Sequence, residues 1–424
     1  MNVKEKEYLR ELAREYKALC DLEENQAKRR AWYRTNDLVK GQKPVFINHY
    51  WPMAIDELFP KDEYVCEDDT ARNYEGYFKI RMFYAQVLKD DNVLEPVVYS
   101  KLFYKLDQYG GINAEITYSA DDHAAAGAYE IIPVILEEED KDLIKDPILT
   151  YDKERSRAEF EKVTELFGDI LTVIKEPTSV GMKLADEYSW LRGIEQTYMD
   201  MYDDPEWMHE VLGKLGENIQ KRLTMTEEVG IWGTLDLSFP LGSSGLRYIT
   251  GVPDFREIEG DIFEYKVKLK DSWGSSIAEV FNCVSSEMHK EFGYDYSKYY
   301  TDLLGNVTVG CCEVLDKKVG LIKDITNARK YSVSEWCNPE LAASEIKDKY
   351  VFSYRAAGVP FVPDEWDKDE VEKEIRSVLE AVKKHECNAE IILNIGGTLG
   401  ANPRQKVTEW SKLVRDLINE YYPE

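Results

Sequence analysis

The feature that most restricts the fold is a regular alternation of strand-like and helix-like segments in the C-terminal half of the chain. Such alternation indicates a parallel sheet with helices on its outer side. Short apolar runs predict late strands at residues 231–237, 277–283, 307–311, 331–334, 350–354 and 390–395. Earlier strand-like runs lie at residues 45–47, 93–99 and 170–174. About eight strand–helix units fit a chain of this length, so we predict a closed (β/α)8 TIM barrel rather than an open sheet.

The rest of the chain is predicted to be added to this barrel. Residues 1–30 are rich in Glu, Lys, Arg, Ala and Leu and predict an exposed amphipathic helix. We therefore expect an N-terminal helical extension over residues 1–40 and the barrel over residues 41–424. The polar stretch 105–147 predicts an irregular insertion. A long helical region breaks at Asp204, which is expected to cap the helix that Pro205 begins.

Charge and cysteine content restrict the partners and the compartment. The chain has 54 basic and 81 acidic residues, a net charge of −27. A field of this sign repels phosphate backbones and anionic lipids, so neither nucleic acid nor a membrane is an expected partner. The seven cysteines are odd in number and scattered, which favours a reducing compartment. With no apolar run of membrane length and a charged start, we expect a cytoplasmic protein with a small-molecule substrate; the oligomeric state stays open.

The strongest candidate for chemistry is the pair Cys311 and Cys312, at the end of a predicted strand. Function in a barrel of this kind lies where strands end, and thiolates are natural zinc ligands. Cys337, at the end of the next strand, is the third candidate metal ligand. Core packing of these cysteines remains the alternative. Neighbouring residues on a continuing strand also point to opposite faces, so only one of Cys311 and Cys312 would then face the opening.

Other polar residues that follow strands complete the candidate site. Glu313 and Asp236 are candidate catalytic acids or bases, and Arg355 could bind a carboxylate or phosphate. An ion pair with an acidic neighbour is the equally weighted alternative for Arg355. Candidate substrate-binding residues at strand ends are His49, Trp51, Trp336 and Tyr354.

Several segments resemble one branch of the uroporphyrinogen-decarboxylase-like superfamily. They are residues 310–316, which include the Gly-Cys-Cys-Glu run, and residues 195–207, 327–336 and 350–355. The resemblance implies a (β/α)8 barrel and a relation to heme-pathway decarboxylases and to cobalamin-linked methyltransferases that move methyl groups to thiols or folates. Those decarboxylases hold substrate carboxylates with an N-terminal arginine-rich motif. The corresponding residues here, 46–51, contain no arginine, which argues against porphyrinogen decarboxylation.

The related methyltransferases bind zinc through a His-x-Cys pair and a distant second Cys. Aligning Cys312 with the first Cys places Gly310 at the His position and glycines 396 and 397 near the second Cys. Cys311, Glu313 or Cys337 would then have to replace the missing ligands. The resemblance therefore implies methyl transfer linked to a corrinoid protein, with zinc as the candidate metal. Such a reaction could form part of a demethylation pathway. The alternatives are a decarboxylase or other lyase, in which Arg355 holds a carboxylate and Asp236 or Glu313 handles protons, and a non-catalytic barrel that binds a ligand or a corrinoid protein.

Overall fold

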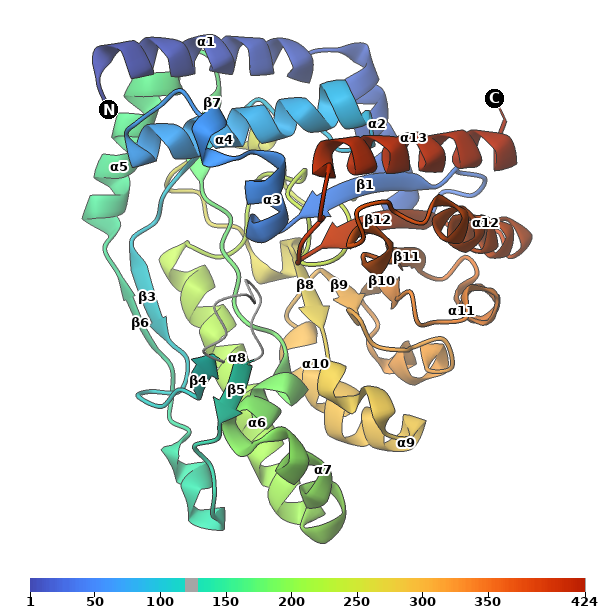
Figure 1. The fold of residues 1–424 in the computed structure, drawn as a ribbon. Helices are drawn as coiled ribbons and strands as arrows, with labels where there is room; N and C mark the ends of the chain where they lie inside the picture. The colour runs from blue at the N-terminus through green and yellow to red at the C-terminus, as the bar shows by residue number, and fades with distance from the viewer. Residues whose placement is uncertain (119–128, 424) are drawn as a thin grey trace.

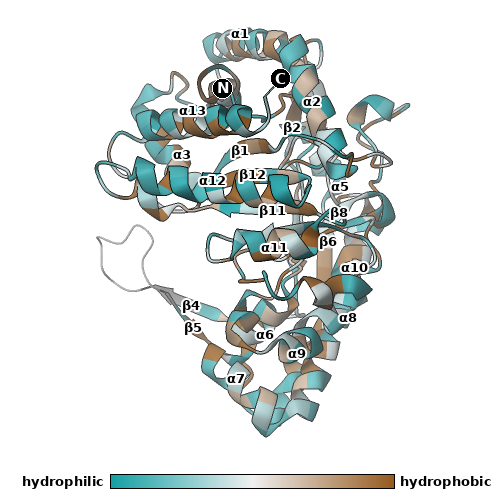
Figure 2. Cartoon of the chain, turned by 90° about the vertical axis from the view of Figure 1, so that its right-hand side faces the viewer, coloured by the Kyte–Doolittle hydropathy of each residue, from teal (hydrophilic) through white to brown (hydrophobic). Residues whose placement is uncertain are grey.

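A curled parallel sheet of six strands forms the centre of the molecule in the computed structural model, which describes residues 1–118 and 129–423 (Figure 1). Its strand order is β1-β12-β11-β10-β9-β8. The strands are β1 (Val45–Tyr50), β8 (Trp273–Ser276), β9 (Asn306–Val309), β10 (Ala328–Val333), β11 (Val351–Ala356) and β12 (Ala389–Ile395). Helices α11 (Pro339–Ile346), α12 (Lys368–Lys384) and α13 (Pro403–Tyr421) cover its outer side, and α12 lies in front of β11 and β12 in Figure 2.

The predicted closed eight-stranded barrel is not shown, although the sheet is TIM-barrel-like. Strands β2 (Val97–Ser100) and β7 (Thr172–Lys175) pair in parallel with each other in a separate sheet. Beside β1, side chains replace a neighbouring strand. The backbone N–H of Phe46 donates to the Asp91 carboxylate and that of Asn48 to the Asp90 carboxylate, both at 2.9 Å. These carboxylates take bonds that strand carbonyls would otherwise accept, so the sheet has a gap between β1 and β2.

Two predicted strands are wrong. Residues 231–237 form no strand and contribute one isolated bridge, from Gly233 to Thr178. Gly233 has φ of +74°, which interrupts an extended run. The second wrong strand is the one predicted at residues 277–283. The strand lies earlier, as β8, and Glu279–Cys283 is a 3-10 helix. An apolar run with no flanking turn signal does not separate a strand from a buried helical turn.

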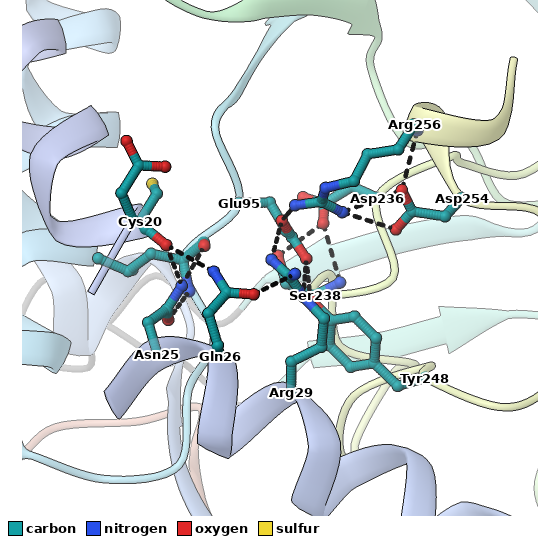
Figure 3. Close-up of polar contacts among 12 residues, drawn as sticks. Cys20, Asn25, Gln26, Arg29, Glu95, Asp236, Ser238, Tyr248, Asp254 and Arg256 are labelled. Atoms are coloured by element: carbon teal, nitrogen blue, oxygen red, sulfur yellow. Dashed lines mark hydrogen bonds and ion pairs between the residues drawn. The ribbon is translucent and has the colours of Figure 1, made fainter. Parts of the chain in front are cut away.

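The N-terminal extension consists of two helices, α1 (Val3–Cys20) and α2 (Glu23–Asn36), rather than one exposed helix. A buried carboxylate, Glu95, connects it to the sheet domain (Figure 3). Arg29 of α2 donates to Glu95 at 3.0 and 2.8 Å, the Tyr248 hydroxyl donates at 2.5 Å, and Arg256 also pairs with it. Because Glu95 is only 1% exposed, these donors must replace its lost hydration.

The remaining helices pack around the sheet and its lower end in Figure 1. They are α3 (Pro52–Leu58), α4 (Asp69–Phe83), α5 (Lys153–Phe167), α6 (Leu184–Arg192), α7 (Ile194–Asp203), α8 (Pro205–Val229), α9 (Ser286–His289) and α10 (Asp295–Thr301). The cap at Asp204 is confirmed, because its side chain accepts the Trp207 N–H and Pro205 begins α8. Within the described residues, no helix has the length and apolar character needed to span a membrane.

The predicted irregular insertion contains two antiparallel strand pairs. Strand β3 (Tyr104–Asp107) pairs with β6 (Ile148–Tyr151), and β4 (Glu115–Tyr118) pairs with β5 (Tyr129–Ile132). Polar, alternating residues at the edge of a domain suit such two-stranded ribbons, in which one face meets water.

The interior of the curled sheet is closed at one end by packed side chains. The loop of residues 237–250 enters this space, and its Leu246 and Tyr248 pack with Trp32, Trp273 and Ile392. An ion pair of 2.6 Å between Lys330 and Glu390 is buried beside them, with both side chains fully inaccessible.

Candidate active site

The two adjacent thiols lie together at the end of β9. The strand stops at Val309, and Gly310 turns the chain with φ of +81°. A side chain at Gly310 would bring its Cβ within 2.4 Å of a Leu315 methyl carbon, so only glycine allows this approach. The sulfur atoms of Cys311 and Cys312 are 3.6 Å apart. The expectation that only one of them faces the opening assumed a continuing strand, and the turn removes that constraint.

Glu279 is a third donor that the sequence analysis missed. It follows β8, and its carboxylate lies within 4.8 Å of both sulfur atoms, as the sulfur atoms do of each other. The Cys312 backbone N–H also donates to it at 3.3 Å. The strand predicted at residues 277–283 includes Glu279. The sequence analysis therefore looked for site residues only after residue 283, whereas β8 ends at Ser276. An acid just after a correctly placed β8 would have been the signal.

The donor set fits a zinc ion. Two thiolates on a tetrahedral zinc, with bonds of about 2.3 Å, stand about 3.8 Å apart, close to the observed 3.6 Å. A hydrogen bond from the Cys311 thiol lowers the pKa of Cys312, and the same bond together with burial raises the pKa of Cys311. Burial alone would raise the pKa of Glu279, but the neighbouring Cys311 side chain and the charge of Lys183 hold it below its ordinary value. These contacts therefore shift Cys312 and Glu279 toward their charged forms and Cys311 toward the neutral thiol.

Buried side chains fix the backbone of Cys311 from both sides. The Glu313 carboxylate accepts the N–H of Cys311 and the N–H of Ala278, the latter at 2.9 Å. The Cys311 carbonyl accepts the Ser332 hydroxyl at 2.5 Å and the Arg355 guanidinium. Burial raises the pKa of Glu313. Two predicted catalytic residues, Glu313 and Arg355, are thus placed to position the thiols.

Cys337 is not brought to the other two cysteines. Its thiol lies 3.8 Å from the Glu313 carbonyl oxygen and 3.5 Å from the Ser334 hydroxyl. The side chain belongs to the main hydrophobic core and lies outside the group formed by Glu279, Cys311 and Cys312. This placement corresponds to the packing alternative for Cys337.

The other predicted residues are divided between the two sides of the sheet. Asp236 is buried and accepts the Tyr99 hydroxyl at 2.5 Å and the Ser238 N–H and hydroxyl at 2.8 and 2.6 Å. Tyr354 points outward, because its hydroxyl donates to Glu374 of α12 at 2.7 Å. Since residues alternate along a strand, this outward direction separates Tyr354 from the inward-facing Arg355.

His49 and Trp51 lie together at the end of β1, whereas Trp336 is apart and exposed. The rings of His49 and Trp51 are 6.0 Å apart, and the Trp51 indole N–H donates to Asn394 of β12 at 2.8 Å. The Nδ1 atom of His49 is buried without a hydrogen-bond partner among the described residues. Burial lowers the pKa of His49 to about 4, so its imidazole is neutral at pH 7. Trp336 is 68% exposed.

We expect Gly310→Ala to destabilise the protein and displace the thiols. The positive φ and the contact with Leu315 predict a loss of roughly 1–3 kcal/mol in the free energy of unfolding. Urea denaturation measures the loss. Gly320→Ala is the matched control, because no atom lies within 4 Å of the position that its new Cβ would take, and a change within about 0.5 kcal/mol is expected. Equal stability of the two variants would contradict the tight turn.

We expect His49 to make stability fall as the solution is acidified. The unfolded state, with a His49 pKa near 6.5, takes up a proton that the folded state resists until about pH 4. The contribution of neutral His49 to the free energy of unfolding is therefore fully present above about pH 6.5 and declines as the pH falls below it. Between pH 7.5 and 5, the native chain should lose about 2 kcal/mol more than His49→Gln. Urea denaturation at the two pH values measures this difference, and parallel losses would show that the fold does not resist protonation of the half-buried His49.

Together, the fold and the site define an α/β protein with a TIM-barrel-like curled sheet and a dithiol–carboxylate group at the carboxyl ends of its strands. No protein-family model matches the sequence, and no curated protein matches it. Among solved structures, the chain is similar to a methyltransferase from Methanosarcina mazei, with a TM-score of 0.50 and 10% sequence identity. The match covers 93% of this chain and 99% of that one. At this identity the likeness shows a common fold, and the Gly-Cys-Cys-Glu branch stays a resemblance.

Proposed function

We propose that this protein is a methyltransferase whose reaction centre is a zinc ion held by Glu279, Cys311 and Cys312. The observation that carries the proposal is the convergence of these three donor atoms within 4.8 Å, at the carboxyl end of the sheet. Three protein ligands leave one tetrahedral position for a substrate, which is the pattern of catalytic rather than structural zinc sites. The similarity in fold to a methyltransferase supports the choice of reaction.

The chemistry divides between the metal and the chain. Zinc, when bound, would lower the pKa of a substrate thiol so that it becomes the nucleophile that accepts the methyl group. Glu313, Ser332 and Arg355 hold the Cys311 backbone in place from opposite sides. The Ser243 hydroxyl lies 3.1 Å from the Cys311 sulfur, where it would donate a hydrogen bond to the thiolate form of that ligand. Such supporting contacts orient ligands and tune the metal.

The methyl donor in this proposal is a corrinoid carried by a partner protein, as the resemblance to cobalamin-linked methyltransferases implies. The test uses zinc-loaded protein with methylcobalamin and a panel of thiols and folates, and follows the absorbance change on demethylation. We expect turnover with at least one thiol, and loss of that turnover in Cys312→Ser. Cys283→Ser, which removes an exposed thiol outside the donor group, should keep it. Absence of turnover with every acceptor would count against methyl transfer and favour a non-catalytic barrel.

The lyase alternative has less support than methyl transfer, because its two proposed proton carriers, Glu313 and Asp236, are already engaged in hydrogen bonds. Both oxygens of Glu313 accept backbone N–H groups, and Asp236 accepts donors from Tyr99 and Ser238. A general acid or base needs a free position toward the substrate. Release of CO2 from candidate carboxylic acids, measured on the same preparation, would reverse this preference.

A further inference from the structure

The two neighbouring thiols differ in their access to solvent, although their sulfur atoms are 3.6 Å apart. Cys311 is 9% exposed, whereas Cys312 is an exposed residue. Of the remaining cysteines, only Cys283 is exposed. The reactivity of a thiol toward an oxidant follows its exposure. An oxidant in solution therefore meets the Cys312 sulfur first, and the buried Cys311 sulfur lies within reach of it.

The backbone at this turn allows Cys312 to move toward Cys311. Buried side chains hold the Cys311 backbone from both sides, whereas the Cys312 N–H donates a long hydrogen bond of 3.3 Å to Glu279. Residues 311–313 belong to no helix or strand, so a shift there breaks no ladder of hydrogen bonds. The sulfur atoms need to approach by about 1.5 Å to reach the bond length of a disulfide, about 2.05 Å.

A disulfide between adjacent residues is strained by the shortness of the backbone that joins them. Neighbouring Cα atoms are about 3.8 Å apart. The Cα atoms of ordinary disulfides are about 4.4–6.8 Å apart. Strain makes a disulfide easier to reduce, and strained disulfides belong to the labile, regulatory class. A bond between Cys311 and Cys312 would therefore open again with a thiol reductant, which makes oxidation of this pair reversible.

We propose that Cys311 and Cys312 form a redox modification site, at which a peroxide converts the two thiols into a disulfide and thereby releases the zinc ion. The release of zinc rests on the proposed function, whereas formation of the disulfide does not. The disulfide removes both sulfur ligands at once and leaves Glu279 alone in the donor group. One carboxylate does not hold zinc, so an oxidant inactivates the metal centre and a reductant restores it.

The oxidation proceeds in two steps, and each step releases one molecule of water. The Cys312 sulfur attacks one oxygen of hydrogen peroxide, the O–O bond breaks, and the products are a sulfenic acid on Cys312 and water. The Cys311 sulfur then attacks the Cys312 sulfur, the S–O bond breaks, and the second water leaves. Two electrons pass from the sulfur pair to the peroxide. When zinc is bound, the sulfurs react as thiolates, solvent supplies two protons, and Zn²⁺ leaves as the free ion.

Treatment of the full chain with hydrogen peroxide, with and without bound zinc, tests the proposal. We expect the peptide that contains both cysteines to lose about 2 Da, one hydrogen from each thiol. A chromogenic chelator should detect about one zinc ion released per chain. Dithiothreitol should restore both the mass and zinc binding. In Cys311→Ser no disulfide forms, so Cys312 should stop at the sulfenic acid, which dimedone traps. Cys283→Ser, the matched control, lacks the other exposed thiol and should react like the native chain.

The outcomes separate this inference from the proposed function. The redox site would be overturned, with the metal centre left standing, if the native chain lost no mass, gained only oxygen on Cys312, formed only cross-links between chains, or formed a disulfide that dithiothreitol does not reduce. Zinc that stays bound after oxidation would equally contradict the proposed release. If the native protein binds no zinc, a reversible disulfide in the metal-free chain that requires both Cys311 and Cys312 would support the redox site although the metal proposal had failed.

Discussion

Cys312→Ser is expected to reduce the zinc content of the purified protein from about one ion per chain to near zero. The substitution removes one thiolate and leaves Cys311 and Glu279, and two ligands do not hold zinc against dialysis with a chelator. A serine hydroxyl is not ionised at pH 7, so it does not replace the sulfur. Elemental analysis by plasma mass spectrometry, after zinc loading and dialysis, gives the stoichiometry.

Three further variants make this result specific. Glu279→Gln removes the charge of the third donor and should weaken zinc binding without abolishing it. Cys337→Ser and Cys283→Ser should keep about one ion per chain, because neither thiol belongs to the donor group. Zinc content near zero in the native protein, or equal content in native protein and Cys312→Ser, would eliminate this metal centre.

Lys330→Ala is expected to have the largest effect on stability, a loss of roughly 3–5 kcal/mol in the free energy of unfolding. Lys330 and Glu390 are fully buried and 2.6 Å apart, so removing the cation leaves a carboxylate without charge compensation. The donors that remain to Glu390, Gly245 and Ser353, are neutral. Urea denaturation measures the change, with Arg376→Ala as a control that breaks surface pairs worth about 1 kcal/mol or less.

A double variant shows whether charge or volume causes this loss. Lys330→Met combined with Glu390→Gln removes both charges and keeps two long side chains in the interior. We expect it to be more stable than Lys330→Ala, because no buried charge is left unpaired. Equal stability of Lys330→Ala and the native protein would mean that Glu390 is protonated in the fold or reaches water.

Local sequence was sufficient to predict the positions of the late strands and of the helices between them. Strands β9 to β12 were predicted to within a few residues, because parallel strands covered on both faces appear as short, nearly continuous apolar runs. The cap at Asp204 and the start of α8 at Pro205 were likewise readable, since both depend on neighbouring residues alone. Closure of the sheet into a barrel could not be predicted locally. The carboxylates of Asp90 and Asp91 occupy the edge of β1, and they lie 42 and 45 residues along the chain from the backbone groups that they bind.

The candidate site divides in the same way. The sequence by itself determined that two adjacent thiols follow a strand and that Gly310 precedes them. Only the tertiary structure decided that Glu279, 32 residues before Cys311, completes the donor group and that Cys337 packs elsewhere. The physical reason is that strand ends and caps depend on neighbours in the chain, whereas ligand sets and ion pairs depend on which loops the folded sheet brings into contact.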